Sequence, residues 1–206
     1  MADNILFIDV ALSRDGSSLS LQDGITIENN VALSTPGGGA LQIASENPSD
    51  HEINADISNN VVFCDNRAPS GSGGAIMLSG HLTVGLRISG NVAFEDNHAG
   101  RGGELALTGE HATVDVIGGV SFRRNSATEV GGAISLVPYT QTAGQAMRDL
   151  YLLHCRDDVL LEANVAGERG GGIYAQGLMG GGMKALFGRR RHRAIVDWSR
   201  CRHFCL

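Results

Sequence analysis

Two short polar stretches are the first candidates for chemistry in this sequence. Asn54-Ala55-Asp56 and Asp157-Asp158 supply carboxylates of the kind that polysaccharide-cleaving enzymes use as acid and base. Neither stretch is joined by the histidine and Arg or Lys motifs that pectin-type hydrolases show. Asn54 and Asp56 are more simply the outward positions of a strand at residues 53–57. We therefore expect no catalytic residues and a non-enzymatic protein, and the alternative is a pectate-lyase-like enzyme acting on polysaccharide.

Candidate metal ligands and nucleotide loops are weak as well. The cysteines are Cys64, Cys155, Cys201 and Cys205. The last two form a CxxxC near His192 and His203, a spacing that matches no common zinc module. The acidic corners at 95–96 and 157–158 could attract calcium, but no aspartate lies inside the glycine phrases, as it does in calcium-binding rolls. No glycine-rich stretch precedes the Lys-Ser/Thr pair of a nucleotide loop. We expect no metal and no cofactor.

Charge divides the chain into two parts. The net charge is −6, but residues 177–206 carry seven basic residues against Asp197, which gives +6 and leaves −12 for residues 1–176. Nucleic-acid binding by the repeat body is therefore not expected. The basic segment is interpreted as a contact segment, as a cap over the end of a stack, or as translation past the genuine reading frame, which its abruptness slightly favours. The chain shows no signal peptide and no apolar run of the ~20 residues that a membrane span needs.

The elements that must position these residues come from a sequence motif that occurs five times. In each copy, apolar residues alternate with other residues and an asparagine comes last: ITIENN (25–30), VVFCDN (61–66), VAFEDN (92–97), VSFRRN (120–125) and VLLEAN (159–164). A second motif follows each copy, in which a glycine pair precedes a short run with apolar residues at every second position, at 38–43, 73–78, 102–107, 131–136 and 170–175. A third stretch, with apolar residues at every second position, precedes each asparagine motif. Period two is typical of strands that bury one face.

This unit predicts an all-β fold, a right-handed parallel β-helix with three strands per coil and about five coils. Each coil would run strand, bend, strand, asparagine, loop, glycines, strand. We expect a partial preceding coil at 1–18, the β-helix repeat domain at 19–176 and a basic irregular tail or cap at 177–206.

The repeated residues are expected to be structural. Phe63, Phe94 and Phe122 would form one inward stack. The asparagines Asn30, Asn66, Asn97, Asn125 and Asn164 would occupy a corner in the left-handed conformation, with amides bonded along the axis. The pairs Gly73-Gly74, Gly102-Gly103 and Gly131-Gly132 would allow a sharp return into the next strand. Glu104 is expected to be exposed, because an unpaired carboxylate is costly to bury.

With FxxN followed by GGA[IL], the sequence resembles the chlamydial polymorphic outer membrane protein repeat over residues 25–176. Units two and four carry both motifs in full, at 63–66 with 73–76 and at 122–125 with 131–134. Glu104 replaces the family's alanine in unit three, and units one and five lack the phenylalanine. The resemblance implies an autotransporter-passenger-like β-helix at an extracellular or outer membrane surface.

That resemblance also implies an adhesin-like role, as a surface-exposed or secreted segment of a larger protein. The partner would be a host or neighbouring cell-surface protein or glycan. The longest interruption of the repeat, at 137–150, contains Tyr139, and a loop that projects from a rigid rod is a usual place for recognition. We expect a contact site there.

Overall fold

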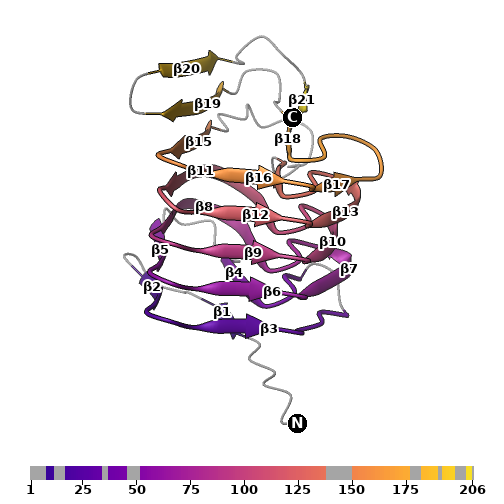
Figure 1. Ribbon diagram of the computed structural model, residues 1–206. Coiled ribbons are helices and arrows are strands. Elements are labelled where there is room, and N and C mark those ends of the chain that lie inside the picture. The colour runs from indigo at the N-terminus through magenta and orange to yellow at the C-terminus, as the bar shows by residue number, and fades with distance from the viewer. Residues whose placement is uncertain are drawn as a thin grey trace.

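The computed structural model describes residues 8–11, 17–33, 37–45, 52–137, 150–176, 182–189, 192–197 and 203–205. All the regular secondary structure in these residues is β-strand (Figure 1). The expectations for Tyr139 and Cys201 lie outside the described residues, and the side chains of His192, His203 and Cys205 are not described either.

The strands of the described residues form three sheets, here called A, B and C. Sheet A contains β1 (Ile8–Ala11), β2 (Ser17–Gln22), β4 (Leu41–Ser45), β5 (Glu52–Ser58), β8 (Ile76–Ser89), β11 (Leu105–Ile117), β14 (Ile134–Leu136), β15 (Leu150–Arg156), β18 (Ile173–Gln176), β19 (Gly182–Arg189), β20 (His192–Asp197) and β21 (His203–Cys205). Sheet B contains β3 (Thr26–Glu28), β6 (Val62–Cys64), β9 (Ala93–Glu95), β12 (Ser121–Arg123) and β16 (Leu160–Glu162). Sheet C contains β7 (Arg67–Ser72), β10 (His98–Arg101), β13 (Ser126–Val130) and β17 (Val165–Ala166).

Pairing between units is parallel and keeps the register of the repeat. In sheet B, Phe63 pairs with Ile27 on one side and with Phe94 on the other, and Phe122 pairs with Phe94 and Leu161. Figure 1 shows the strands of successive units stacked one above another. Antiparallel pairs occur where β21 joins β18 and β20 joins β19. The expected all-β parallel β-helix is confirmed.

The assignment of strands within a unit differs from the expectation in two places. The segment between the asparagine and the glycines, expected as a loop, forms sheet C. The glycine-phrase strand and the leading strand of the next unit are continuous in β8 and β11, with a register shift between Gly109 and His111. Sheet C had a weak sequence signal because its strands bury small residues, with Ala68 and Ala99 at 0% exposure.

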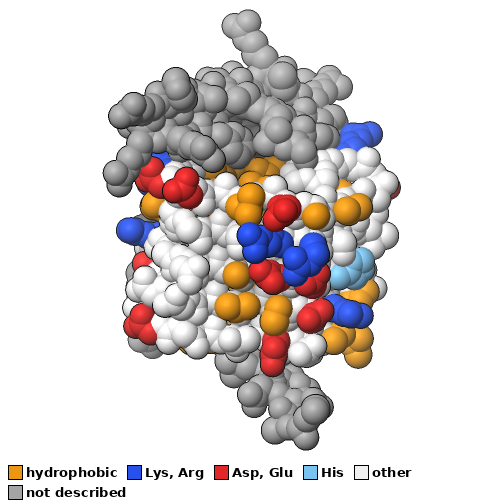
Figure 2. Space-filling view, viewed as in Figure 1, with side chains coloured by type: hydrophobic (Ala, Val, Ile, Leu, Met, Phe, Trp, Pro, Cys, Tyr) orange, Lys and Arg blue, Asp and Glu red, His pale blue; other side chains and the backbone are white. Residues whose placement is uncertain are grey.

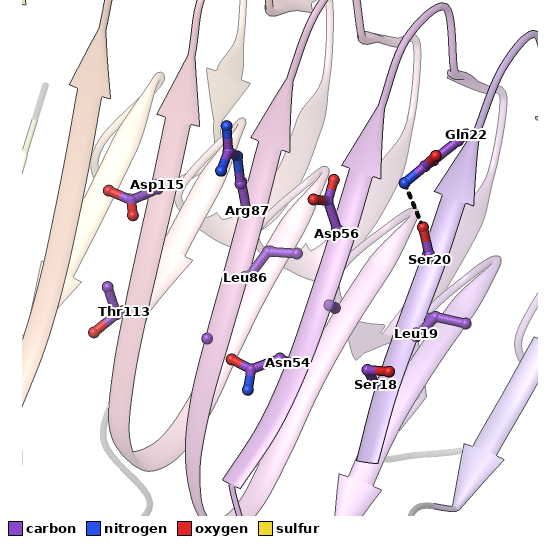
Figure 3. Close-up of a pocket in the computed structure, with 12 residues that line it drawn as sticks. Ser18, Leu19, Ser20, Gln22, Asn54, Asp56, Leu86, Arg87, Thr113 and Asp115 are labelled. Carbon is purple, nitrogen blue, oxygen red and sulfur yellow. Dashed lines mark hydrogen bonds between the residues drawn. The ribbon is translucent and has the colours of Figure 1, made fainter. Parts of the chain in front are cut away.

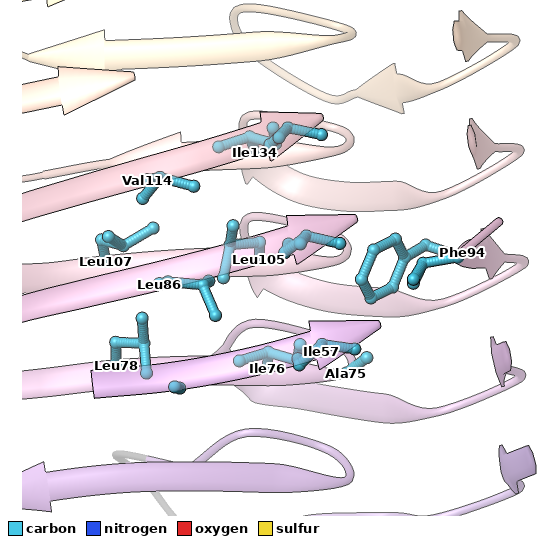
Figure 4. Close-up of a cluster of buried hydrophobic side chains, with 14 of the residues drawn as sticks. Ile57, Ala75, Ile76, Leu78, Leu86, Phe94, Leu105, Leu107, Val114 and Ile134 are labelled. Atoms are coloured by element: carbon cyan, nitrogen blue, oxygen red, sulfur yellow. The ribbon is translucent and has the colours of Figure 1, made fainter. Parts of the chain in front are cut away.

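The interior is a column of aliphatic and aromatic side chains between the three sheets (Figure 4). Phe63, Phe94 and Phe122 are fully buried. Their ring centroids are 5.1 Å and 4.9 Å apart, with interplanar angles of 16° and 11°. Ile27 continues this stack at 1% exposure, whereas Leu161 is only partly buried at the other end. Because equivalent residues stack in register, each coil depends on its neighbours to exclude water.

The left-handed backbone at the corner lies one residue before each asparagine of the repeat. These residues are Asn29 (φ 59°), Asp65 (53°), Asp96 (58°), Arg124 (54°) and Ala163 (55°). The expectation that the repeat asparagines themselves adopt this conformation is wrong. The preceding residue turns the chain, and the asparagine then directs its amide into the stack.

Ala163 occupies this corner without the local hydrogen bonding that lets Asn and Asp tolerate positive φ. Substitution Ala163→Gly is therefore expected to raise the free energy of unfolding by about 0.5–1 kcal/mol, measured by urea denaturation. Ala93→Gly in β9 is the control, and it should lower the free energy by a similar amount, because glycine weakens a strand. An Ala163→Gly variant no more stable than the parent chain would contradict the assigned corner.

Candidate functional site

A ladder of asparagine side chains ties the coils together. Its members are Asn30, Asn66, Asn97, Asn125 and Asn164. Asn66 shows the pattern. Its Nδ2 donates to Asn97 Oδ1 at 3.0 Å and to the carbonyl oxygen of Ile27 at 3.0 Å, and its backbone N–H donates to Asn97 Oδ1 at 2.9 Å. The same contacts recur at Asn97 and Asn125. The ladder thus satisfies polar groups that the corner buries at Asn66, Asn97 and Asn125, whereas Asn30 Oδ1 at its first member has no hydrogen-bond partner.

The two glycines of each pair have different roles. The first glycine is left-handed, with φ of 73° at Gly73 and 67° at Gly131. The second glycine permits close approach: a Cβ on Gly74 would collide with the carbonyl oxygen of Gly103 in the next coil. Gly103 and Gly132 are confined in the same way. A side chain at either position would therefore separate the coils.

Glu104 is buried, so the expectation that it is exposed is wrong. It shows 0% exposure, as do Ala75 and Ala133 at the equivalent position of the neighbouring units. Asn97 Nδ2 donates to Glu104 Oε2 at 2.6 Å, while Glu104 Oε1 has no hydrogen-bond partner. Burial raises the pKa of this carboxyl well above 4.5, although the bond from Asn97 opposes the shift. The site favours the neutral acid.

This burial makes stability depend on pH. A raised folded-state pKa gives full stability below the unfolded value near 4.5, followed by a loss as the pH rises toward the folded value. Glu104→Gln, which is neutral and similar in shape, is expected to remove this loss. Urea midpoints between pH 4 and pH 9 should therefore diverge in favour of the variant as the pH rises, whereas Glu168→Gln at an exposed position should follow the parent chain. Parallel profiles for Glu104→Gln and the parent chain would refute the assignment.

A groove lined by polar and apolar residues lies on the outer face of sheet A, across β2, β5, β8 and β11 (Figure 3). Its volume is about 550 Å³. The register aligns one row of side chains across successive strands: Ser20, Asp56, Arg87, Asp115 and His154. The first four line the groove, and His154 follows on β15. The predicted outward placement of Asn54 and Asp56 is confirmed, since both line this groove.

The charges of this row are not all paired. Asp115 Oδ1 lies 2.7 Å from His154 Nδ1 and 3.6 Å from an Arg156 guanidinium nitrogen. Arg87 is exposed and makes no ion pair or hydrogen bond with any residue the structure describes. Asp56 Oδ1 is buried without a hydrogen-bond partner. The groove therefore holds the Arg87 guanidinium on the strand next to the Asp56 carboxylate, and the two groups do not form an ion pair with each other.

The other polar candidates do not join this groove. Asp157 and Asp158 form a turn between β15 and β16, with φ of 56° and 67°. Cys64 contacts Glu28 Oε2 at 3.6 Å, and burial raises the pKa of its thiol to about 11. Burial also raises the pKa of Cys155 to about 12. Both cysteines are free, and no group of three or more metal-ligating side chains occurs among the described residues.

The acidic corner at 95–96 lies against two arginines on the outer face of sheet B. Arg124 contacts Asp96 Oδ2 at 2.7 Å and Glu95 Oε2 at 3.3 Å, and Arg123 lies 3.9 Å from Glu95. The hydrogen bond from Arg124 lowers the pKa of Asp96. Figure 2 shows acidic and basic side chains together on this face. Neighbouring coils thus neutralise the carboxylates that were considered as calcium ligands.

Sequence reasoning missed Arg87, Asp115 and His154 because they lie 28 to 39 residues apart and fall in no local motif. A signal was present. Each directly precedes the last inward residue of its leading strand, as Asp56 precedes Ile57.

Comparison with known proteins gives one match. No curated protein and no solved structure matches the chain. Across the described residues, no helix has the length and apolar character to cross a membrane. One unit matches a family model over residues 60–79, which hold Phe63, Asn66 and the pair Gly73-Gly74. The resemblance inferred from FxxN and GGA[IL] is therefore confirmed for that unit, which matches the Chlamydia polymorphic membrane protein repeat.

Proposed function

We propose that this chain is a non-enzymatic repeat scaffold, an adhesin-like segment of a surface-exposed or secreted protein. Its partner would be a host or neighbouring cell-surface protein or glycan, bound at the outer face of sheet A. The repeat match at 60–79 supports the surface association, because that repeat belongs to membrane proteins. The row Asp56, Arg87 and Asp115 carries the proposal, since it presents polar groups that are not all paired on a rigid sheet.

The solenoid suits this role because it fixes the spacing of the row. Parallel strands are about 4.8 Å apart, so each coil contributes one side chain at a set distance from the next. The backbone beneath them is held by ladder hydrogen bonds on both sides, as in the pairing of β8 with β5 and β11. Such a surface loses little conformational freedom on binding, which favours affinity.

A cell-binding assay tests the proposal. Fluorescently labelled chain is added to epithelial cells and to bacterial cells, and bound protein is measured against concentration. Arg87→Ala is expected to lower binding at least tenfold. Arg101→Ala, which removes the exposed contact with Glu129 on sheet C, should bind as the parent chain does. Equal binding by all three proteins, or no binding to either cell type, would refute a contact surface on sheet A.

A polysaccharide-cleaving enzyme is the second candidate, and one observation favours it. Asp56 and Asp115 flank Arg87, so their Cα atoms are roughly 9.6 Å apart, at two strand spacings of about 4.8 Å. Inverting glycoside hydrolysis uses carboxyl groups about 6.5–9.5 Å apart, a range whose upper end lies close to this Cα spacing. Release of reducing ends from polygalacturonate that is lost in Asp56→Asn and in Asp115→Asn would establish the enzyme in place of the scaffold.

A further inference from the structure

Gly85 leaves a hollow in the centre of the groove. In its row across the sheet, Ser18, Asn54 and Thr113 carry side chains, whereas Gly85 on β8 carries none. A Cβ at this position would overlap Asn54 Oδ1, so the Asn54 side chain covers part of this hollow. At Gly85 the floor of the groove is backbone, with the polar side chains of the neighbouring strands beside it (Figure 3).

The groups beside this hollow include both acceptors and donors. Asp56 pairs in register with Arg87, two residue pairs beyond Asn54 and Gly85 along the same strands and on the same face of the sheet. An ionised carboxylate only accepts hydrogen bonds, and a guanidinium only donates them. A hydroxyl group does both, so a ligand with neighbouring hydroxyls satisfies Asp56 and Arg87 together.

Other classes of ligand fit less well. Protein hot spots are usually large aromatic anchors, but no aromatic residue lines this groove, and of its two leucines Leu86 is only 2% exposed and Leu19 is half-buried. An anionic ligand on Arg87 would meet Asp56 and Asp115 on the adjacent strands. A cationic ligand on either carboxylate would meet Arg87. The mixture favours a neutral molecule.

We propose that the hollow over Gly85 binds a neutral, hydroxyl-rich glycan. A sugar ring lies on the backbone of β8, with Arg87 donating to and Asp56 accepting from its hydroxyls. The side chains of Asn54 and Thr113 bound the ring on the neighbouring strands. This assignment rests on the proposed contact role of sheet A and names the ligand class of the same groove.

Binding of the full chain to defined polysaccharides tests the assignment. Dextran, mannan and galactan are the neutral probes, polygalacturonate is the acidic probe and chitosan is the basic probe, each measured by isothermal titration and by retention on the immobilised polymer. Binding to at least one neutral probe is expected, with little change between 50 mM and 500 mM salt. Binding to none of the neutral probes, or to polygalacturonate or chitosan alone, overturns the proposal.

Two variants locate the site. Gly85→Val fills the hollow without removing a polar group, and it should lower affinity for the neutral probe at least tenfold. The fold should persist, because Gly85 lies within strand β8 outside the left-handed region, valine favours strands, and the one close overlap is with the end of the Asn54 side chain, which can rotate away. Arg87→Ala, at an exposed position, should also weaken binding and keeps the test decisive if Gly85→Val does not fold. Unchanged affinity in Arg87→Ala or in a folded Gly85→Val overturns the site.

Cell binding separates this proposal from the proposed function. The glycan assignment predicts that the bound neutral probe competes with cells for the parent chain. If Arg87→Ala loses cell binding while the neutral polysaccharides neither bind nor compete, the contact surface stands and the glycan assignment is wrong. If the polysaccharide binds but no cell does, the glycan site stands and the adhesin-like role is wrong.

Discussion

Replacing Phe94 with alanine is expected to lower the free energy of unfolding by about 3–5 kcal/mol. The ring is fully buried between Phe63 and Phe122, with centroid distances of 5.1 Å and 4.9 Å. Its removal leaves a cavity in the middle of the column. The neighbouring rings cannot close that cavity, because each is fixed to its own coil by the pairing of sheet B. Guanidinium denaturation followed by circular dichroism measures the loss.

The adjacent residue supplies the control. Glu95 points outward from the same strand and contacts Arg124 at 3.3 Å and Arg123 at 3.9 Å on the surface. Exposed ion pairs contribute about 0–1 kcal/mol, so Glu95→Ala should be nearly neutral. Similar losses for Phe94→Ala and Glu95→Ala would contradict the alternation of inward and outward residues on which the fold depends.

Asn97→Ala is the second substitution with a large expected effect, a loss of at least about 3 kcal/mol. Asn97 Oδ1 accepts from the backbone N–H of Asn66 at 2.9 Å and from its Nδ2 at 3.0 Å. Its own amide reaches Glu104 Oε2, Asn125 Oδ1 and the carbonyl of Phe63. Alanine would leave several buried polar groups without a partner, at roughly 1 kcal/mol or more each. Urea unfolding gives the difference.

Two further variants identify the cause of that loss. Asn91→Gly removes an exposed bond to Asn60 at a residue whose φ of 61° glycine tolerates, and it should change stability by less than about 1 kcal/mol. Adding Glu104→Ala to Asn97→Ala should recover part of the stability, because it removes a buried carboxyl that has lost its donor and restores the residue found at Ala75 and Ala133. A double variant less stable than Asn97→Ala would show that Glu104 packing, not its hydrogen bond, dominates.

Much of the fold could be predicted because its strongest signals are periodic. Phe63, Phe94 and Phe122 recur at the same point of the alternation, and parallel stacking of identical units brings such residues together without any further information. The matching Asn66, Asn97 and Asn125 follow at a constant offset, so their contact along the axis was also predictable.

Features that depend on a single neighbour were not predictable. Glu104 is buried at a position where the neighbouring units carry alanine, and Asn97 supplies one hydrogen bond to it, whereas charge alone indicated exposure. The left-handed residues Arg124 and Ala163 have no common chemistry, so no composition rule identifies them. The groove residues Arg87 and Asp115 follow from the register, and they become visible when every unit is aligned on its last inward residue rather than on a motif.

The amide ladder has a direction, and that direction bears on how such a protein changes during evolution. From Asn30 to Asn125, each asparagine amide donates to the Oδ1 of the asparagine in the next coil toward Asn164, always in the same sense, while Asn30 Oδ1 at the first coil has no hydrogen-bond partner. A tandem duplication of one complete turn, spliced in between two others, would meet matching chemistry above and below without compensating substitutions. Height can therefore be gained or lost by recombination in whole-turn steps without a change in the hydrogen-bonding pattern of the ladder.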